Sequence, residues 1–596
     1  MRALIALPLF LVSPALAQTC LGDITVVDGR EVCQPIPARD TFDRVLRDYE
    51  TWRLSEDPVR AGQDGDLDAA RVWPDVSPEA DARREAQLQA FRTRLDRVEV
   101  PEAESLNAEL LRYVVLRDLR RAPFDEARIP FLNDSGFFSA PGSVARTSTF
   151  RTTDDYAAYA ERLTKLPEWF KAQRVNMDRG IETGVTASAD ILPGVIDAVR
   201  RLAETPVEEH PAFAPFTTFP DSMSVRDRNR MEALGRAAVA SSVIPAYRDL
   251  LAYFEDTYAP AARESAGIGS DPAAREHYKA LVKHYTTLDL TPDEVHRIGQ
   301  NEVRRIRREM DGAMREAGFE GTFAEFLEFL RTDPQFYARS EDELLMRASY
   351  LAKQVDGIMP EWFGLLPRLP YGVRKVPDDI APAYTTGRYW GGSLEQGRAG
   401  NYMVNTYDLN ERPLYNLPAL TLHEGVPGHH HQISLAQELE NVPSFRQDLY
   451  PNAFGEGWGL YAERLGEEMG LYKTPYERFG RLTYEMWRAC RLVVDTGLHW
   501  KGWTREQAEA CFIENSALSR GNIKSEVDRY ISWPGQALAY KIGELKIVEL
   551  RERAEAELGD RFDIRAFHDA VLEDGGVPLA VLERKIDRWI EEQRSS

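Results

Sequence analysis

Residues 417–432 read LPALTLHEGVPGHHHQ, and the rest of the chain is best understood outward from this stretch. Its first six residues are mostly apolar, which predicts a buried helix and places His423 in the core. Four of the ten histidines of the chain fall within nine residues here, at positions 423, 429, 430 and 431. A buried His–Glu pair followed by further histidines is destabilising unless a ligand satisfies it. The stretch therefore predicts a core helix that carries a polar site.

The segment begins like the zinc-peptidase pattern H-E-x-x-H, in which two histidines one helical turn apart bind zinc and the glutamate is the general base. The fourth residue after His423 is Pro427, which cannot bind a metal. On a regular helix His429 would lie about 120° around from His423, whereas His430 would share its face but lie about 10.5 Å along the axis. Zinc–nitrogen bonds of about 2.0–2.1 Å cannot bridge that rise.

We therefore expect the helix to bulge at residues 425–428 and to bring His429 to the place of the second ligand. Two glycines and a proline in this segment permit such a bulge. His430 or His431 takes that place if the bulge has another length, so the second ligand stays open. A surface histidine cluster, or a capped core helix that binds no metal, is the alternative.

A third ligand is expected from the segment PNAFGEGWGLYAE at residues 451–463. Glu456 follows His429 by enough residues for a loop and a returning helix. Its alternative role is that of an acid in the first turn of a helix, where the helix dipole favours it. Glu463 lies two turns further on the same face and either supports a metal ligand or is a surface acid. Two histidines and one glutamate with an open position are typical of catalytic zinc, so we predict zinc as the cofactor.

The body of the chain is predicted to be mainly α-helical, with amphipathic runs over most of its length. One such run at residues 292–317 begins with an N-cap threonine, a proline and two acids. The region 415–440 is predicted as one helix containing the bulge. Residues 375–390 and 400–407 are rich in β-branched and aromatic residues, which predicts a small β-sheet beside the zinc-binding helix. The segment 401–407 is a candidate for binding an extended peptide by strand addition.

The N-terminus is typical of an exported protein. Residues 1–17 form an expected signal peptide, with Arg2, an apolar run and a cleavage site after Ala17. The residues before Cys20 lack the apolar residue usual for lipid attachment, so we expect periplasmic or secreted protein without a lipid anchor. Cys20 and Cys33 predict a disulfide that closes the segment 18–40. Cys490 and Cys511 lie in successive predicted helices and either pair or remain free thiols.

Composition limits the partners. The chain has 596 residues and a net charge of −22, which argues against nucleic acid and anionic membranes. No segment after the signal peptide has the character of a transmembrane helix, so no stable membrane association is expected. A body of residues 41–596 is long enough to divide into two lobes. The oligomeric state cannot be inferred from these properties.

Three motifs together resemble the bacterial "domain of unknown function 885" family: HEGVPGHHHQ, FGEGWGLYAERL and RYISWPGQALAYKIG. That family looks like a distant branch of the gluzincin metallopeptidases, alongside the angiotensin-converting-enzyme and thermostable-carboxypeptidase groups. The resemblance covers roughly residues 40–590 and implies a multi-helical peptidase fold with a deep cleft between two helical lobes. It implies zinc ligation by His423, His429 and Glu456, with Glu424 as the base. The insertion before Pro427 leaves the choice among residues 429–431 open.

The same resemblance implies a role for the segment 524–543. Arg529 and Tyr530 resemble an Arg-Tyr pair whose tyrosine supports the transition state. We therefore expect Tyr530 to donate to the oxyanion, with Tyr540 and Lys541 as further candidates, although a tyrosine on a helical stripe is often a core residue. The carboxylate-binding lysine and tyrosine of the converting-enzyme group have no convincing match, so exopeptidase specificity does not carry over.

A helix face at residues 491–499 carries Arg491, Asp495 and His499 at every fourth position. A buried ion-pair ladder is the preferred interpretation, and support of the zinc ligands is the alternative. The function predicted from all of these features is that of an exported zinc peptidase acting on short peptides. A zinc hydrolase of non-peptide amides or esters and a non-catalytic periplasmic binding protein are the alternatives.

Overall fold

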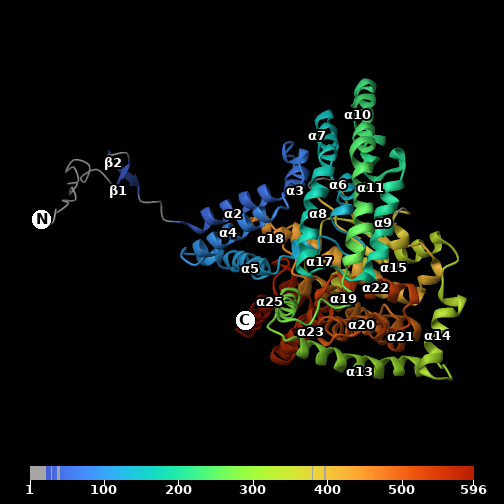
Figure 1. Ribbon diagram of the computed structural model, residues 1–596. Helices are drawn as coiled ribbons and strands as arrows, with labels where there is room; N and C mark the ends of the chain where they lie inside the picture. Colours follow the sequence, from blue (N-terminus) through green and yellow to red (C-terminus); the bar gives the residue numbers. More distant parts are fainter. Residues whose placement is uncertain (1–21, 28–29, 36–39, 379, 395–396, 596) are drawn as a thin grey trace.

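The amphipathic pattern of the sequence forms α-helices along most of the chain in the computed structural model, which describes residues 22–27, 30–35, 40–378, 380–394 and 397–595 (Figure 1). Helix starts follow the expected chemistry: Thr291 caps α13 and Glu294 completes its capping box. The helices before the sheet are α2 Phe42–Glu56, α3 Pro58–Gln63, α4 Pro78–Leu95, α5 Ser105–Arg121, α6 Ala140–Thr147, α7 Thr153–Thr164, α8 Leu166–Thr183, α9 Leu192–Glu204, α10 Val225–Ala238, α11 Ile244–Tyr253, α12 Pro272–Thr286, α13 Pro292–Glu316, α14 Phe323–Thr332 and α15 Glu341–Trp362.

The helices after the sheet carry the candidate site. They are α16 Leu417–Glu424, α17 His429–Gln437, α18 Ser444–Asp448, α19 Asn452–Glu468, α20 Pro475–Thr496, α21 Arg505–Asn515, α22 Arg520–Ser532, α23 Ala539–Leu558, α24 Ile564–Leu572 and α25 Leu579–Ser595. The mainly α fold class is confirmed. None of the helices in the described part of the chain is long and apolar enough to cross a membrane.

Two small sheets accompany the helices. Strands β1 (Gly22–Val27) and β2 (Arg30–Pro35) form an antiparallel hairpin. The second sheet has the order β3–β5–β4, with β3 at Tyr371–Lys375, β4 at Gly387–Trp390 and β5 at Gly400–Val404. Strand β5 runs parallel to β3 and antiparallel to β4. The predicted sheet before the histidine-rich helix is confirmed, but within residues 375–390 only the ends belong to strands, and the described residues between β3 and β4 include a short 3-10 helix at Ala381–Ala383.

The predicted helix at 415–440 is two helices. α16 ends at Glu424 and α17 begins at His429, and the peptide bond between Val426 and Pro427 is cis. The indole N–H of Trp458 on α19 donates to the Pro427 carbonyl at 2.7 Å. A Cβ on Gly428 would lie 2.1 Å from the His423 carbonyl oxygen, so only glycine fits there. The interruption is where the sequence predicted it, but the chain leaves the helix and starts a new one instead of bulging.

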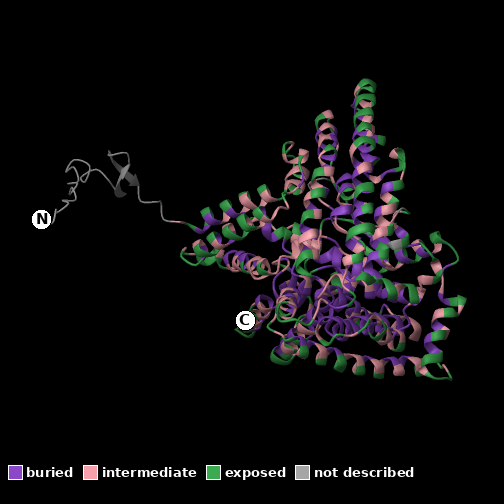
Figure 2. Cartoon of the chain, viewed as in Figure 1, coloured by how far each residue is buried: buried purple, intermediate pink, exposed green. Residues whose placement is uncertain are grey.

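Helix α20 lies at the centre of the molecule. Its residues from Phe479 to Thr496 are all buried, and Figure 2 shows the buried part of the chain concentrated around α19, α20 and α23. α13 packs along α20, and α19 packs on α23. The latter pair approach closely at Gly457 and Gly543, because a Cβ on Gly543 would lie 1.8 Å from the Ala453 carbonyl oxygen. Most of the buried apolar side chains belong to two large clusters, and residues of α20 occur in both.

A disulfide joins Cys490 of α20 to Cys511 of α21, which settles the open pairing of these two residues. The other predicted pair, Cys20 with Cys33, lies outside the described residues because position 20 is not among them. The expected signal peptide at 1–17 also lies outside them.

Candidate metal centre

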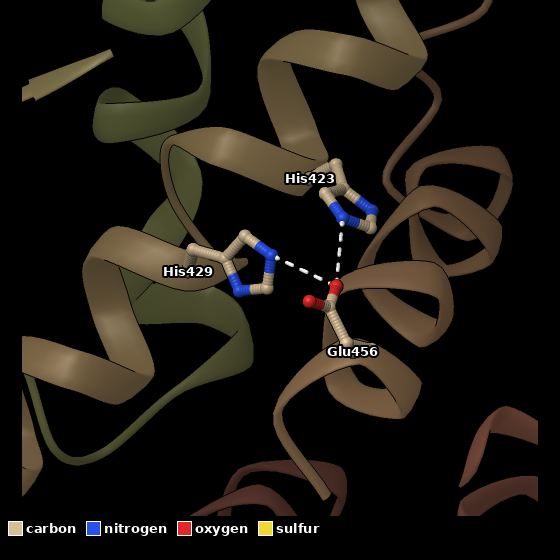
Figure 3. Close-up of side chains that lie close together, drawn as sticks. All are labelled: His423, His429 and Glu456. Carbon is tan, nitrogen blue, oxygen red and sulfur yellow. Dashed lines mark ion pairs between the residues drawn. The ribbon is translucent and has the colours of Figure 1, made fainter. Parts of the chain in front are cut away.

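Three side chains from α16, α17 and α19 meet at one point. His423, His429 and Glu456 each offer one ligand atom, and these atoms lie within 4.8 Å of one another. Oε2 of Glu456 lies 3.3 Å from Nε2 of His429 and 3.7 Å from Nε2 of His423. Figure 3 shows both imidazoles directed at this carboxylate across the break between α16 and α17. The break is what turns two histidines six residues apart toward a shared partner.

The spacing fits a tetrahedral metal ion. Two ligand atoms at about 2.0–2.1 Å from one zinc ion lie roughly 3.3–3.4 Å apart at the tetrahedral angle. The two distances from Glu456 are 3.3 and 3.7 Å, so small side-chain movements bring the set to that geometry. Two imidazoles and one carboxylate are also the donor types of catalytic zinc sites. The residues therefore fit the metal that the motif predicts.

The two imidazoles of the triad each have a polar side chain close to Nδ1, the ring nitrogen that points away from Glu456. Oε1 of Glu463 lies 2.8 Å from Nδ1 of His423, and both side chains are almost fully buried. Nε2 of Gln432 lies 2.8 Å from Nδ1 of His429 and donates to the Gly455 carbonyl. In each histidine a polar side chain thus lies 2.8 Å from Nδ1, at ion-pair distance in His423 and at hydrogen-bond distance in His429, and Nε2 is left to face Glu456. Such contacts fix ring orientation in metal sites.

Electrostatics couple the triad. Burial lowers the pKa of His423, but hydrogen bonding to Glu456 and Glu463 outweighs it and raises the pKa to about 10. Burial raises the pKa of Glu456, but its contacts with the two histidines hold it well below the usual range. In the metal-free chain His423 therefore carries a proton that a metal ion must displace.

Glu424 lies beside the triad without joining it. The backbone N–H of Tyr389 on β4 donates to Oε2 of Glu424 at 2.7 Å, and the carboxylate lines the same cavity as the triad. His430 faces away: its Nδ1 lies 3.0 Å from the Tyr389 hydroxyl, and its ring packs on Tyr371. Of the adjacent histidines, the structure thus brings only His429 to the triad.

The triad opens into a cavity of about 260 Å³. Its walls combine the end of α16, strand β4 and helices α20, α22 and α23. Tyr540 is one wall, since its ring centroid lies 6.3 Å from that of His423 and nearly parallel to it. The polar and aromatic residues around the cavity include Thr386, Arg388, Glu424, Tyr450, Trp487, Arg488, Arg491, Arg529 and Tyr540.

The family model for the bacterial protein of unknown function DUF885 matches residues 58–586. The chain belongs to this family. It is similar to a solved structure described as the putative lipoprotein from Colwellia psychrerythraea, with 28% sequence identity, a TM-score of 0.83 and coverage of 92% of this chain and 99% of that chain. A putative lipoprotein of unknown function from Shewanella oneidensis shares the fold at 16% identity and a TM-score of 0.69, over 91% and 99% of the two chains. No curated protein matches the chain.

In this DUF885 protein Tyr530 does not line the cavity. Its hydroxyl donates to Glu526 at 2.6 Å and accepts from Trp487 and Arg491 at 2.8 Å. With all its hydrogen bonds used in the core, Tyr530 is not placed to meet a substrate. The expectation that Tyr530 is the oxyanion donor is therefore corrected, and Tyr540 is the tyrosine of this segment that reaches the cavity.

Two further candidates lie elsewhere in the DUF885 fold. Lys541 is buried among carboxylates, with Nζ 2.7 Å from both Glu485 and Glu544. Nε2 of His499 lies 2.9 Å from the Tyr530 carbonyl oxygen, and its Nδ1 accepts from a backbone N–H. Neither residue lines the cavity of the triad.

The predicted ladder along α20 is wrong in its pairing. Arg491 pairs with Glu526 at 2.8 Å, and Asp495 accepts hydrogen bonds from Tyr278 and from the Gly535 backbone N–H. These groups are buried as expected, but each finds its partner on another helix or turn. Residues four apart on α20 all face neighbours, because the helix is surrounded on every side.

The segment 401–407 cannot add a peptide strand, because β5 is the central strand of its sheet and already has two neighbours. β4 is an edge strand, and its residues Gly387 to Tyr389 line the cavity. Two other functional candidates escaped the sequence reasoning. Tyr389 holds Glu424 through its backbone, which no side-chain motif reveals. Arg488 had a signal in the sequence, because it lies about one turn before Arg491 on the same helix.

Proposed function

We propose that this protein is a zinc-dependent hydrolase of the peptidase type. The observation that carries the proposal is the triad of His423, His429 and Glu456, whose ligand atoms lie within 4.8 Å inside a cavity that Glu424 also lines. A gluzincin-like arrangement, with the cleft between two lobes, is part of the same proposal. The site combines metal-ligand chemistry with a separate carboxylate base, which a purely structural metal site does not need.

Zinc, when bound, polarises a substrate carbonyl and makes water a stronger acid. Glu424 then takes a proton from the attacking water and passes it to the leaving amine. The Tyr389 N–H at 2.7 Å orients this carboxylate toward the cavity. Tyr540 is placed to donate to the developing oxyanion, because Arg529 already donates to its hydroxyl oxygen at 3.1 Å and the hydroxyl proton remains available.

A peptide substrate is favoured by the edge strand. Strand β4 pairs with β5 on one side only, and it forms part of the cavity wall. An extended peptide pairs with such an edge through backbone hydrogen bonds. Apart from the Tyr389 N–H, which donates to Glu424, the backbone groups of β4 that face away from β5 are therefore the proposed pairing partners of an extended peptide next to Glu424.

Export is part of the proposal. The similar structure from Colwellia psychrerythraea is described as a putative lipoprotein, and the Cys490–Cys511 disulfide is typical of an oxidising compartment. Both support the expected signal peptide and a location in the periplasm or outside the cell.

The proposal is tested with the Glu424→Gln variant. We expect about one zinc per chain by elemental analysis in both the wild type and the variant, because Glu424 is not a ligand. Peptide hydrolysis should fall about 10²–10⁴-fold in the variant, the usual contribution of a general base. Glu440→Gln, on an exposed residue, is the matched control. Protein purified without chelator that holds no transition metal would overturn the proposal.

A further inference from the structure

Arginine side chains gather in the cavity beyond the metal triad. Arg488 and Arg491 on α20 and Arg529 on α22 line it together with Arg388 on β4. Tyr540 connects this cluster to the triad: its ring centroid lies 6.3 Å from the His423 ring and 4.2 Å from the Arg491 guanidinium carbon. The arginines therefore begin about one side chain away from the candidate metal ligands.

The buried charges of this arginine cluster are not balanced by the surrounding chain. Arg488 and Arg491 are 4% and 2% exposed. The side chain of Arg529 is 17% exposed. Within ion-pair distance the three guanidinium groups meet only two carboxylates, Glu463 and Glu526, among the described residues. Glu463 is in addition 2.8 Å from the His423 imidazole. A bound divalent metal adds further positive charge to the same cavity.

Each of the three guanidinium groups also has one nitrogen whose N–H lacks a hydrogen-bond acceptor among the described residues. Nη1 of Arg491, Nε of Arg488 and Nε of Arg529 are buried and have no hydrogen-bond partner in the described part of the chain. Burying a charged donor without a hydrogen-bond acceptor costs free energy. A bound anion that accepts these hydrogen bonds would remove that cost. The remaining contacts of Arg491, with Tyr530 and Glu526, hold its guanidinium plane in place.

We propose that the cluster of Arg488, Arg491 and Arg529 binds a carboxylate of the substrate. The guanidinium group matches a carboxylate with two parallel hydrogen bonds, and a rigid, desolvated group discriminates most strongly. An extended peptide advances about 3.3–3.6 Å per residue, so the recognised carboxylate belongs to one of the first few residues beyond the cleaved bond. It is either the C-terminal carboxylate or an Asp or Glu side chain. This inference rests on the proposed hydrolase function and names its substrate class.

A contiguous second cavity gives the peptide room. A space of about 270 Å³ shares Thr385, Thr386, Arg388 and Arg529 with the first. Arg529 therefore stands at the junction of the two, where a chain passing between them meets its guanidinium group.

The test measures peptide binding, separately from turnover. Two pairs of peptides are titrated into the Glu424→Gln protein by calorimetry. The first pair is acetylated tri-alanine with a free C-terminal acid and the same peptide with a C-terminal amide. The second pair is an amidated peptide that contains Asp and the same peptide with Asn in its place. We expect at least about tenfold tighter binding for the member of one pair that carries the carboxylate, that is, at least about 1.4 kcal/mol. A difference in the first pair assigns the C-terminal carboxylate, and a difference in the second assigns an acidic side chain.

Variants of Arg529 locate the effect. Arg529→Gln should reduce the preference for the carboxylate peptide to less than about threefold. Arg529→Lys should leave an intermediate preference, because lysine keeps the charge but loses the paired N–H groups of the guanidinium. Arg565→Gln, on the exposed face of α24, should leave the preference unchanged. Equal binding within both pairs, or no binding of either carboxylate peptide, overturns the inference. A preference that survives Arg529→Gln in a folded protein also overturns it.

Hydrolysis by the wild type separates this inference from the proposed function. If carboxylate peptides bind selectively but none is cleaved, the arginine site stands and the hydrolase proposal fails. If peptides are cleaved but acid and amide, and Asp and Asn, are bound and cleaved equally, the hydrolase stands and the carboxylate site fails.

Discussion

Glu456 contacts both imidazoles of the triad through a single oxygen, Oε2. A carboxylate can accept several hydrogen bonds, so one oxygen can face both imidazoles, and the contacts with the two histidines together hold the pKa of Glu456 well below its usual range. The position of His429, and not of His430, at this carboxylate follows from the residues that separate α16 from α17. The identity of the second ligand is therefore a question that two single variants decide.

His429→Ala should lose zinc, because it removes one of three protein ligands. His430→Ala should keep about one zinc per chain, since its Nδ1 lies near the Tyr389 hydroxyl and not in the triad. Elemental analysis of the two purified variants makes the comparison. Zinc retained in His429→Ala and lost in His430→Ala would show that the ligand assignment is off by one.

Glu463→Gln should weaken zinc binding about 10–100-fold, the usual effect of removing a partner that orients a ligand. The side chain keeps its size but loses the charge that faces Nδ1 of His423. Competition with a chelator of known affinity measures the change. Glu468→Gln, on the exposed side of the same helix, is the control, and equal affinities for both variants would contradict the role given to Glu463.

At the scale of elements, the site depends on how closely α19 approaches α16. A Cβ on Gly459 would lie 2.7 Å from the His423 ring, so the absence of a side chain lets the imidazole lie against the helix backbone. The same helix supplies Glu456, Gly459 and Glu463 within two turns. One segment of α19 thus supplies three features of the site. Glu456 belongs to the triad, Gly459 leaves room for the His423 ring, and the Glu463 carboxylate lies behind that ring.

Gly459→Ala should destabilise the protein by about 1–3 kcal/mol, because the methyl group displaces the His423 ring or the helix. Its zinc affinity should fall as well. Gly357→Ala on α15 has open space around its Cβ and should stabilise by roughly 0.5–1 kcal/mol through helix propensity. Unfolding in urea measures both. Equal stabilities for the two variants would contradict a destabilising contact between the new methyl group and the His423 ring.

Sequence patterns predicted the helices, the small sheet and the interruption near Pro427, since these depend on local periodicity and residue type. The form of the interruption was not predictable, because the Trp458 indole that holds the Pro427 carbonyl comes from α19. The same reason explains Tyr530: a motif locates it beside Arg529, but its orientation is decided by Trp487 and Arg491 on α20. Strand order likewise made β4 the edge strand.

At the scale of the whole molecule, α20 is a helix whose residues from Phe479 to Thr496 are buried although several of them are charged. Its arginines and acids are paired with groups on several other helices, including the cluster of Glu485 with Arg305, Arg481 and Lys541. Breaking one such pair leaves a buried charge, which is strongly destabilising. The stability of the centre of the protein therefore depends on pH.

Asp495 is the group on α20 whose titration is easiest to isolate. Burial raises its pKa to about 7, against opposing hydrogen bonds from Tyr278 and the Gly535 N–H. Between an unfolded value near about 3.9 and this pKa, the folded protein holds a proton that the unfolded chain has lost. This contribution to the free energy of unfolding is full at low pH and is lost as the pH rises toward 7.

Asp495→Asn should therefore gain stability relative to the wild type as the pH rises from 5 to 7, approaching about 1.4 kcal/mol per pH unit. Asparagine keeps the oxygen that accepts from Tyr278. Urea unfolding of both proteins at several pH values measures the difference. Parallel pH profiles of the two proteins would mean that Asp495 is ionised in the folded state throughout.

The candidate metal triad and the arginine cluster come from successive parts of the chain. His423, His429 and Glu456 come from α16, α17 and α19, whereas the arginine cluster comes from the later helices α20 and α22. Closing a short loop loses less chain entropy than closing a long one. The triad therefore closes a shorter loop than any contact that joins His423 to the helix of Arg529. We expect the three side chains of the triad to come together before the arginine cluster is complete.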